Sequence, residues 1–272
     1  MYAVFDGHGG GEVAKYSRSH FERILNEVEE FKSGSDICEG MRKGFLRVDE
    51  SLVGGGLEEV GKMRADNPPT KSPLMKILSD VTNKKKAAMQ GAIAAADEPN
   101  EDDDDTNLDS IGCTANVIMV DYAAKKLFVA NAGDSRSCMG RAGTCIPLSF
   151  DHKPEGEIEI ARIHAAGSVI TEGRVDGHLN LTRALGDLKF KKKAGLTAEQ
   201  HAVTANPDVF TYDLTTQDDF IIMGCDGCWE TLSNEEMVAY VYEKLNKTTD
   251  RSAEFLKGIV QSLLHELVSP NH

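Results

Sequence analysis

The chain has 272 residues, a net charge of −14 at pH 7, 40% hydrophobic residues and six cysteines. This negative charge argues against nucleic acid or an anionic membrane as the main partner, because both favour basic surfaces. No apolar stretch approaches the roughly 18 residues of a membrane span, and no signal-peptide pattern is present. Six cysteines in a chain of this length form no dense disulfide framework. We therefore expect a cytoplasmic or nuclear protein, or one found in both.

The first half of the chain contains two predicted helices and a long irregular stretch. Apolar residues recur at helical spacing over residues 11–31, and a second helix is predicted over 36–53. From 54 to 108, glycine, proline and charge runs replace the periodic pattern, which indicates a mostly exposed insertion. Within it, one alanine-rich helix is expected near 84–97. The acidic run at 101–105 is more typical of a solvated loop than of a cation site.

The second half is richer in strand signals. "TANVIMVDY" and "KKLFVANAGD" flank a short turn, which predicts an antiparallel hairpin. "DDFIIMGCDG" predicts another buried strand, and a helix follows it, opened by a capping box between Ser233 and Glu236. The last helix carries apolar residues on one broad face, namely Phe255, Leu256, Ile259, Val260, Leu263, Leu264 and Leu267. Antiparallel strands with helices grouped around them indicate an α+β architecture.

Three predicted strands end in an aspartate beside a glycine: "YAVFD" ends at Asp6, "LFVANAGD" at Asp134 and "FIIMGCD" at Asp226. Glycine lets the backbone turn sharply and approach a ligand closely. If these strand ends meet, the carboxylates repel one another and are costly to bury unless they are paired or metal-bound. A hard divalent cation such as Mg²⁺ or Mn²⁺ relieves both problems. A single such aspartate is more typical of a turn, but three together favour a metal site.

Seven motifs carry a resemblance to a known family. In chain order they are "YAVFDGHGG" (2–10), "GCTANVIM" (112–119), "VANAGDSR" (129–136), "DHKP" (151–154), "GRVDGHLNLTRALGD" (173–187), "PDV" (207–209) and "CDGCWETLSNEE" (225–236). Together they resemble the metal-dependent protein serine/threonine phosphatases of type 2C. The likeness runs from residue 1 to about 240 and is interrupted by the 54–108 insertion.

The resemblance implies one catalytic domain over residues 1–272. Its fold is expected to be a four-layer α/β/β/α sandwich with two mainly antiparallel central sheets and a variable flap at 187–206. Family members also carry an N-terminal and a C-terminal strand that supply further metal ligands. The resemblance implies that both of these strands are lacking here, because the chain shows neither pattern.

The resemblance also implies a metal centre of two Mg²⁺ or Mn²⁺ ions, with a third that binds more weakly. Asp6 matches the carboxylate that bridges the two metals, and Gly7 matches a residue that donates its backbone carbonyl. Asp226 matches a further ligand. Asp134, with Glu230 near it, matches the ligand of the weaker third metal.

Three other residues are implied to act on the substrate. His8 matches the general acid that protonates the leaving alkoxide, and Thr114 matches a hydroxyl close to the metal-bound waters. Arg174 matches a basic residue that helps to bind phosphopeptide. The implied reaction is hydrolysis of phosphoserine and phosphothreonine in proteins by a metal-bound water, without a phosphoenzyme. We expect a monomer whose partners are phosphorylated proteins. The alternative is a catalytically impaired pseudophosphatase that binds phosphoproteins or regulates them.

Several other residues are predicted to have structural roles and no role in the reaction. Cys225 and Cys228 have the spacing of a redox or zinc pair, but no second ligand pair is evident, so packing beside the preceding strand is favoured. His152 is expected in a loop or on a helix surface. The lysines at 191–193 are expected on a solvated face of the flap, and Trp229 is expected to fill core space.

Overall fold

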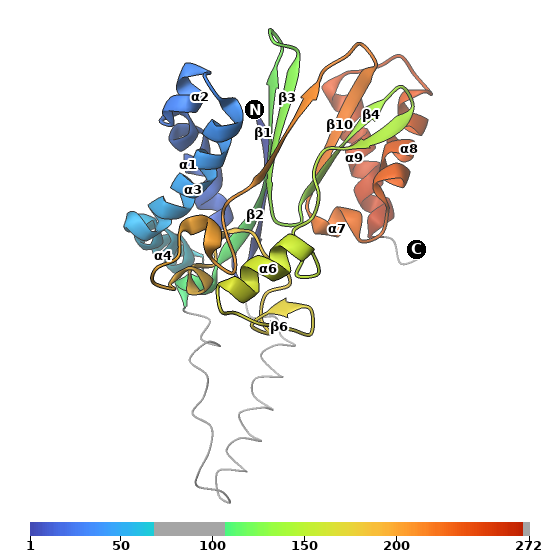
Figure 1. Ribbon diagram of the computed structural model, residues 1–272. Coiled ribbons are helices and arrows are strands. Elements are labelled where there is room, and N and C mark those ends of the chain that lie inside the picture. Colours follow the sequence, from blue (N-terminus) through green and yellow to red (C-terminus); the bar gives the residue numbers. More distant parts are fainter. Residues whose placement is uncertain (68–106, 269–272) are drawn as a thin grey trace, which may run out of the picture.

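Two antiparallel sheets lie face to face at the centre of the computed structural model, which describes residues 1–67 and 107–268 (Figure 1). The first sheet has the order β1 (Tyr2–His8), β2 (Gly112–Asp121), β3 (Lys126–Ala132) and β9 (Asp208–Asp213), with β8 (Leu185–Gly186) also paired to β2. The second sheet has the order β10 (Asp218–Gly224), β4 (Arg136–Arg141) and β5 (Thr144–Pro147). A separate small sheet joins β6 (Ile170–Thr171) to β7 (Arg174–Val175).

Helices cover the outer faces of both sheets. On the first sheet lie α1 (Glu12–Asn26), α2 (Glu29–Ser33), α3 (Ile37–Ser51) and α4 (Leu57–Asp66), and on the second lie α8 (Asn234–Leu245) and α9 (Ala253–Leu267) (Figure 1). The short α7 (Asp226–Trp229) follows β10 directly, and α6 (Glu157–Ala165) lies beyond the sheet ends (Figure 1). Helix, sheet, sheet and helix form four layers, so the predicted α+β sandwich is confirmed.

Alternate residues of the central strands enter different cores. Val117 of β2 packs with α1 and α3, whereas the next residue, Ile118, packs against Met139 of the second sheet. This follows from the period of two in a β-strand. Both faces of β2 are therefore buried, which explains why its sequence is a nearly continuous apolar run.

The predicted helix over 11–31 is wrong in one respect, because the chain leaves the helix between two segments. α1 ends at Asn26, and Val28 is extended with φ −77° and ψ 122° before α2 begins. The break turns α2 against α3, where a Cβ on Gly40 would lie 2.7 Å from Phe31. Val28 is fully buried, so the apolar period continues through a position that is not helical.

The second predicted helix is confirmed as α3, and a further helix follows it. α3 is capped by Asp36, whose side chain accepts a hydrogen bond from the Glu39 backbone N–H at 2.9 Å. The chain bends at Leu52–Gly56, where Gly54 and Gly55 have non-helical φ and ψ, and then forms α4. The expectation of an irregular stretch from 54 is therefore wrong for Leu57–Asp66. The reason is burial, because Leu52 and Val60 belong to the first core. The expected helix near 84–97 and the acidic run at 101–105 lie outside the described residues.

The elements predicted for the second half are confirmed. β2 and β3 form the hairpin, β10 is the strand before Asp226, and Ser233 and Glu236 form the capping box of α8. The broad apolar face of α9 is only half covered. Ile259 and Leu263 are buried, while Leu256, Val260 and Leu264 are 43%, 54% and 46% exposed. Among the described helices, none has the length and apolar character needed to cross a membrane.

Three short 3-10 helices complete the described structure, at Leu108–Ser110, Leu188–Lys191 and Ala198–Gln200. The last two belong to the predicted flap, and the flap is anchored to α3. Lys191 binds Asp49 through two contacts of 2.8 and 2.9 Å, and its side chain is only 6% exposed. The prediction of a solvated Lys191 is therefore wrong, because a buried carboxylate of α3 pairs with it.

Candidate active site

The ends of β1 and β10 bring two of the predicted carboxylates together. Asp6 lies near the end of β1, and Asp226 begins α7 directly after β10. Carboxylate oxygens of Asp6 and Asp226 and the Sγ of Cys225 all lie within 4.8 Å of one another. The sequence pattern thus predicted this meeting of two strand ends correctly, although the strands belong to different sheets.

Asp6 is in an unfavourable place for a charged group. Burial raises its pKa above the ordinary value, and the carboxylates of Asp226 and Asp134 raise it further. The carboxyl groups of Asp6 and Asp226 lie next to each other at the two strand ends. Neither forms an ion pair with a basic side chain within residues 1–67 and 107–268. A divalent cation would relieve this repulsion, and oxygen donors suit Mg²⁺ and Mn²⁺, so these residues fit such an ion.

The turn after β1 requires glycine. A Cβ on Gly7 would lie 2.8 Å from the carbonyl oxygen of Gly10, so any side chain would displace the backbone there. Beside this turn, Asp6 lies opposite Thr114 of β2. The Thr114 hydroxyl is buried and forms a 2.7 Å hydrogen bond with the hydroxyl of Ser135. The site therefore combines the glycine-containing end of β1 with a pair of hydrogen-bonded hydroxyl groups, those of Thr114 and Ser135.

The third predicted carboxylate, Asp134, forms an ion pair with a lysine. Asp134 is buried and forms an ion pair with Lys153. The neighbouring residues pair in the same way, since Arg136 makes two contacts of 2.5 and 2.8 Å with Asp151. Two side chains of the "DHKP" motif, Asp151 and Lys153, therefore form ion pairs with two side chains of the "GDSR" motif. A metal-binding role for Asp134 stays a prediction, and Lys153 is its partner in this structure.

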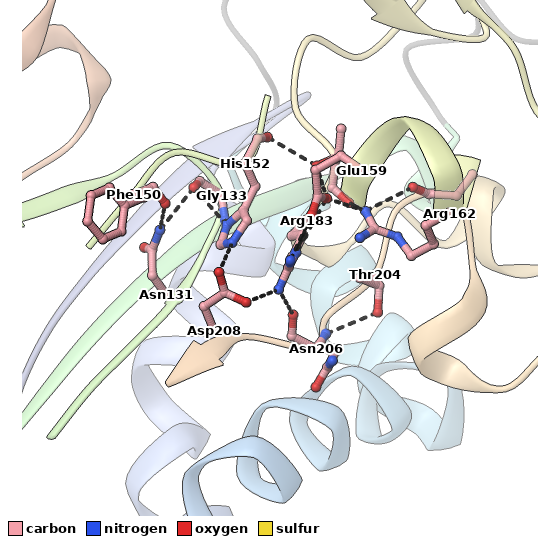
Figure 2. A network of polar contacts seen from close by, with 12 residues as sticks. Asn131, Gly133, Phe150, His152, Glu159, Arg162, Arg183, Thr204, Asn206 and Asp208 are labelled. Atoms are coloured by element: carbon pink, nitrogen blue, oxygen red, sulfur yellow. Dashed lines mark hydrogen bonds and ion pairs between the residues drawn. The ribbon is translucent and has the colours of Figure 1, made fainter. Parts of the chain in front are cut away.

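His152 completes this contact between the two motifs. Its Nδ1 lies 3.2 Å from both the backbone nitrogen and the carbonyl oxygen of Gly133, and its Nε2 lies 3.2 Å from Asp208 (Figure 2). His152 lies in a loop, which is one of the two expected positions, but its side chain is buried and not on the surface. Because Gly133 precedes Asp134, His152 fixes the backbone that carries that carboxylate.

A buried chain of charges continues from Asp208 (Figure 2). Arg183 binds Asp208 at 2.7 Å and Glu159 of α6 at 2.7 Å, and Arg162 binds Glu159 at 2.5 Å. Burial alone would raise the pKa of Glu159, but the two guanidinium groups outweigh it and lower the pKa to about 2. The hydrogen bond from His152 and the charge of Arg183 likewise hold the pKa of Asp208 below its usual value. This network joins α6 and β9 to the loop that carries Asp134.

His8 has a partner that the sequence analysis did not identify. Its Nε2 lies 2.6 Å from a carboxylate oxygen of Asp187, which is 1% exposed. Burial lowers the pKa of His8, but Asp187 outweighs burial, and the net pKa is raised. Since Nε2 faces Asp187, Nδ1 is the ring nitrogen left for other partners. The signal available in the sequence was the final Asp of "RALGD", which follows a strand directly.

The register of the strands on either side of β2 brings His8 and Asp187 together. His8 lies opposite Gly112, and Gly112 lies opposite Gly186, so the residue after Gly186 faces the histidine across β2. A Cβ on Gly112 would overlap the carboxylate of Asp187. Asp187 itself is held with φ 50°, and its N–H donates to the carbonyl of Ile111 at 2.9 Å. The glycine in "GCTANV" is therefore needed for the contact.

The last two predicted residues, Arg174 and Glu230, are exposed. Arg174 is exposed in the small sheet, and its guanidinium donates to the carbonyl of His178 at 2.8 Å. Glu230 is exposed directly after α7, and its backbone N–H donates to the carbonyl of Asp226 at 3.1 Å. Their roles in binding phosphopeptide and metal stay predictions.

Comparison with known proteins gives a consistent result. The family model described as Protein phosphatase 2C matches residues 1–54 and 52–262. "Probable protein phosphatase 2C 21" of Arabidopsis thaliana is 37% identical over 265 residues, which is 93% of this chain and 70% of that protein. "Protein phosphatase 2C 1" of Paramecium tetraurelia is 36% identical over 271 residues, covering 100% of this chain and 77% of that protein.

Solved structures agree on the fold. A phosphatase from Toxoplasma gondii superposes with a TM-score of 0.63 at 20% identity, covering 98% of this chain and 80% of that one. A sex-determining protein of C. elegans superposes with a TM-score of 0.65 at 22% identity. The present chain is covered to 98% in that comparison and spans about half, 53%, of the nematode chain. At these identities the likeness concerns the architecture alone.

Proposed function

Because the chain belongs to the protein phosphatase 2C family, we propose that its Asp6–Asp226 site performs metal-dependent hydrolysis of phosphoserine and phosphothreonine in proteins. One observation carries the assignment to this site. Two carboxylates at the ends of strands of different sheets meet within 4.8 Å, where neither has a basic partner in the described part of the chain. Such a pair needs a cation, and the family's reaction is metal-dependent.

The residues that would hold the metal are Asp6, Asp226 and the backbone carbonyl of Gly7. Mg²⁺ or Mn²⁺ bound there supplies an activated water and neutralises the charge of the phosphoryl group. We propose two ions per site. A third would have to compete with Lys153 for Asp134, which gives a physical reason for weaker binding.

The protein's own groups then orient the substrate and move a proton. His8 is held by Asp187 through Nε2, so a proton on Nδ1 can be given to the departing serine or threonine oxygen. The hydroxyls of Thr114 and Ser135 are fixed beside Asp6 and can orient water. Arg174 offers an exposed guanidinium for phosphopeptide. No residue has to carry the phosphoryl group covalently.

The pseudophosphatase alternative has no observation in its favour. A retired site would have no chemical need for Asp6, His8 and Asp226, yet all three are present, and Asp187 orients His8. The site therefore keeps both the carboxylate pair that needs a cation and a histidine positioned by a buried partner. We further propose that the protein acts as a monomer on phosphorylated proteins.

The test is phosphate release from a phosphothreonine peptide. We expect turnover with Mn²⁺, none with EDTA, and a loss of more than about tenfold in Asp226→Asn at fixed Mn²⁺. Asp219→Asn is the matched control, because Asp219 is exposed on β10, the strand that precedes Asp226, and the asparagine can still accept from the Tyr242 hydroxyl. A chain that binds the peptide without Mn²⁺-dependent turnover would be a pseudophosphatase.

A further inference from the structure

Asp49 and Lys191 form a largely buried ion pair that the proposed reaction does not use. Asp49 belongs to α3, and Lys191 is the last residue of the 3-10 helix at Leu188–Lys191 in the flap. Their side chains are 13% and 6% exposed, and the Lys191 Nζ lies 2.8 and 2.9 Å from the two carboxylate oxygens. Water and salt screen such a pair much less than one on the surface, so it can hold the flap against α3.

Both side chains also bind the backbone just before the flap. The Lys191 ammonium donates to the carbonyl oxygen of Ala184 at 2.8 Å. The Oδ1 atom of Asp49 accepts the backbone N–H of Gly186 at 2.8 Å. The ion pair therefore fixes the chain at residues 184 and 186, immediately before Asp187.

Asp187 has a backbone conformation that needs such support. Its φ of 50° lies in the left-handed region, which few residues other than glycine adopt. Its carbonyl accepts the Phe190 N–H at 3.0 Å, so the first turn of the flap begins on it. A conformation of this kind persists only where the surrounding contacts fix it. A small shift of this backbone would take the Asp187 carboxylate out of hydrogen-bond range of His8, which it contacts at 2.6 Å.

We propose that Asp49 and Lys191 are positioning residues for the phosphatase reaction. They hold residues 184–187 so that the Asp187 carboxylate stays on the Nε2 atom of His8. Because Lys191 belongs to the flap, a movement of the flap changes the orientation of the histidine. The effect on catalysis rests on the proposed function, whereas the effect on the contact between His8 and Asp187 does not.

The test needs variants that separate positioning from folding. Lys191→Met removes both contacts of the ammonium group, but it leaves the Asp49 carboxylate without its cation, which destabilises the fold. The double variant Asp49→Asn/Lys191→Met removes both charges and keeps an oxygen for the Gly186 N–H. Lys192→Met is the matched control, because Lys192 is the next flap residue, is 64% exposed and pairs with Asp109. An exposed ion pair of this kind contributes little to stability.

The first measurement follows the contact between His8 and Asp187 by nuclear magnetic resonance of the folded, metal-free chain with isotope-labelled histidine. The ring signals of His8 are identified by their absence in His8→Asn, and Asp187→Asn shows where they lie once the charged partner is lost. We expect Lys191→Met and the double variant to move them towards that position, and Lys192→Met to leave them in place. Unmoved signals in both Lys191 variants, or an equal shift in Lys192→Met, would overturn the proposal.

The second measurement compares a phosphothreonine peptide with 4-nitrophenyl phosphate, whose leaving group needs no acid. In Lys191→Met and in the double variant, kcat for the peptide should fall about tenfold, while kcat for the aryl phosphate and both KM values stay within about twofold. In an Asp187→Asn background, Lys191→Met should lower kcat little further. An equal fall for the two substrates, or a full additional loss in that background, would show that the pair serves stability alone.

The two measurements keep this proposal separate from the function of the site. Turnover with Mn²⁺ but unmoved His8 signals refutes the positioning role and leaves the phosphatase standing. Signals that move as expected, in a protein without Mn²⁺-dependent turnover, support the positioning of Asp187 and refute the reaction.

Discussion

Replacing Asp187 by asparagine tests whether the buried carboxylate serves catalysis or only folding. The side chain keeps its size beside Gly112, where the fit is tight. What it loses is the charge of a 2.6 Å contact with His8. A hydrogen bond to a charged group is worth about 1.5–3 kcal/mol. At about 1.4 kcal/mol per decade, kcat for a phosphothreonine peptide should fall by roughly 10- to 100-fold.

The choice of substrate separates catalysis from stability. A phosphothreonine peptide releases a basic alkoxide that must be protonated, whereas 4-nitrophenyl phosphate releases an acidic phenol that leaves without help. We therefore expect Asp187→Asn to lose activity on the peptide and to keep most of it on the aryl phosphate. His8→Asn should show the same pattern, and the double variant should lose little more than His8→Asn alone.

A uniform loss would refute this reasoning. If Asp187→Asn reduces kcat equally for the peptide and the aryl phosphate, the carboxylate acts on folding or metal binding and does not act through His8. The same conclusion would follow if the losses from the two single variants simply added in the double variant, because residues that act as a unit are not additive.

Two further substitutions test the ion pairs of Glu159 and Asp134. Glu159 has a pKa lowered to about 2 from 4.5, so its ionised form stabilises the fold above about pH 4.5, and this contribution is lost as the pH falls towards 2. Glu159→Gln should cost about 3 kcal/mol at pH 7 and much less at pH 3 in urea unfolding; an equal cost at both pH values would contradict the assignment. Lys153→Met removes the partner of Asp134, leaving a buried carboxylate that a cation can neutralise. The Mn²⁺ concentration for half-maximal activity should then fall several-fold by titration, and an unchanged or higher value would show that Asp134 does not bind metal.

The sequence predicted those features that depend on a short stretch of chain. Asp6 and Asp226 were identified because an apolar run followed by Asp-Gly shows where a buried strand stops, and the strand ends do meet. The capping box of α8 was likewise local. The partner of His8 was missed because 179 residues separate it from Asp187. Only the register across β2 brings the two together.

Predictions from charge and apolar periodicity were wrong at two positions where the side chain is buried against a distant element. Lys191 belongs to a run of lysines, which usually indicates a solvated surface, but Asp49 of α3 lies 142 residues away and pairs with it inside the protein. Val28 fits the apolar period of a continuous helix because a buried extended residue and a buried helical one look alike in sequence. In both cases the deciding contact is with an element that the local pattern does not contain.

The distribution of partners among the acidic residues shows where a cation is needed. Most buried acids near the site already have one, since Asp134 pairs with Lys153, Asp187 with His8, and Glu159 with Arg183 (Figure 2 shows the last of these). Asp6 and Asp226 instead face each other, and burial together with their repulsion raises the pKa of Asp6. The free energy gained by binding a divalent ion is therefore concentrated at this one pair, which is where hydrolysis of a phosphoryl group requires it.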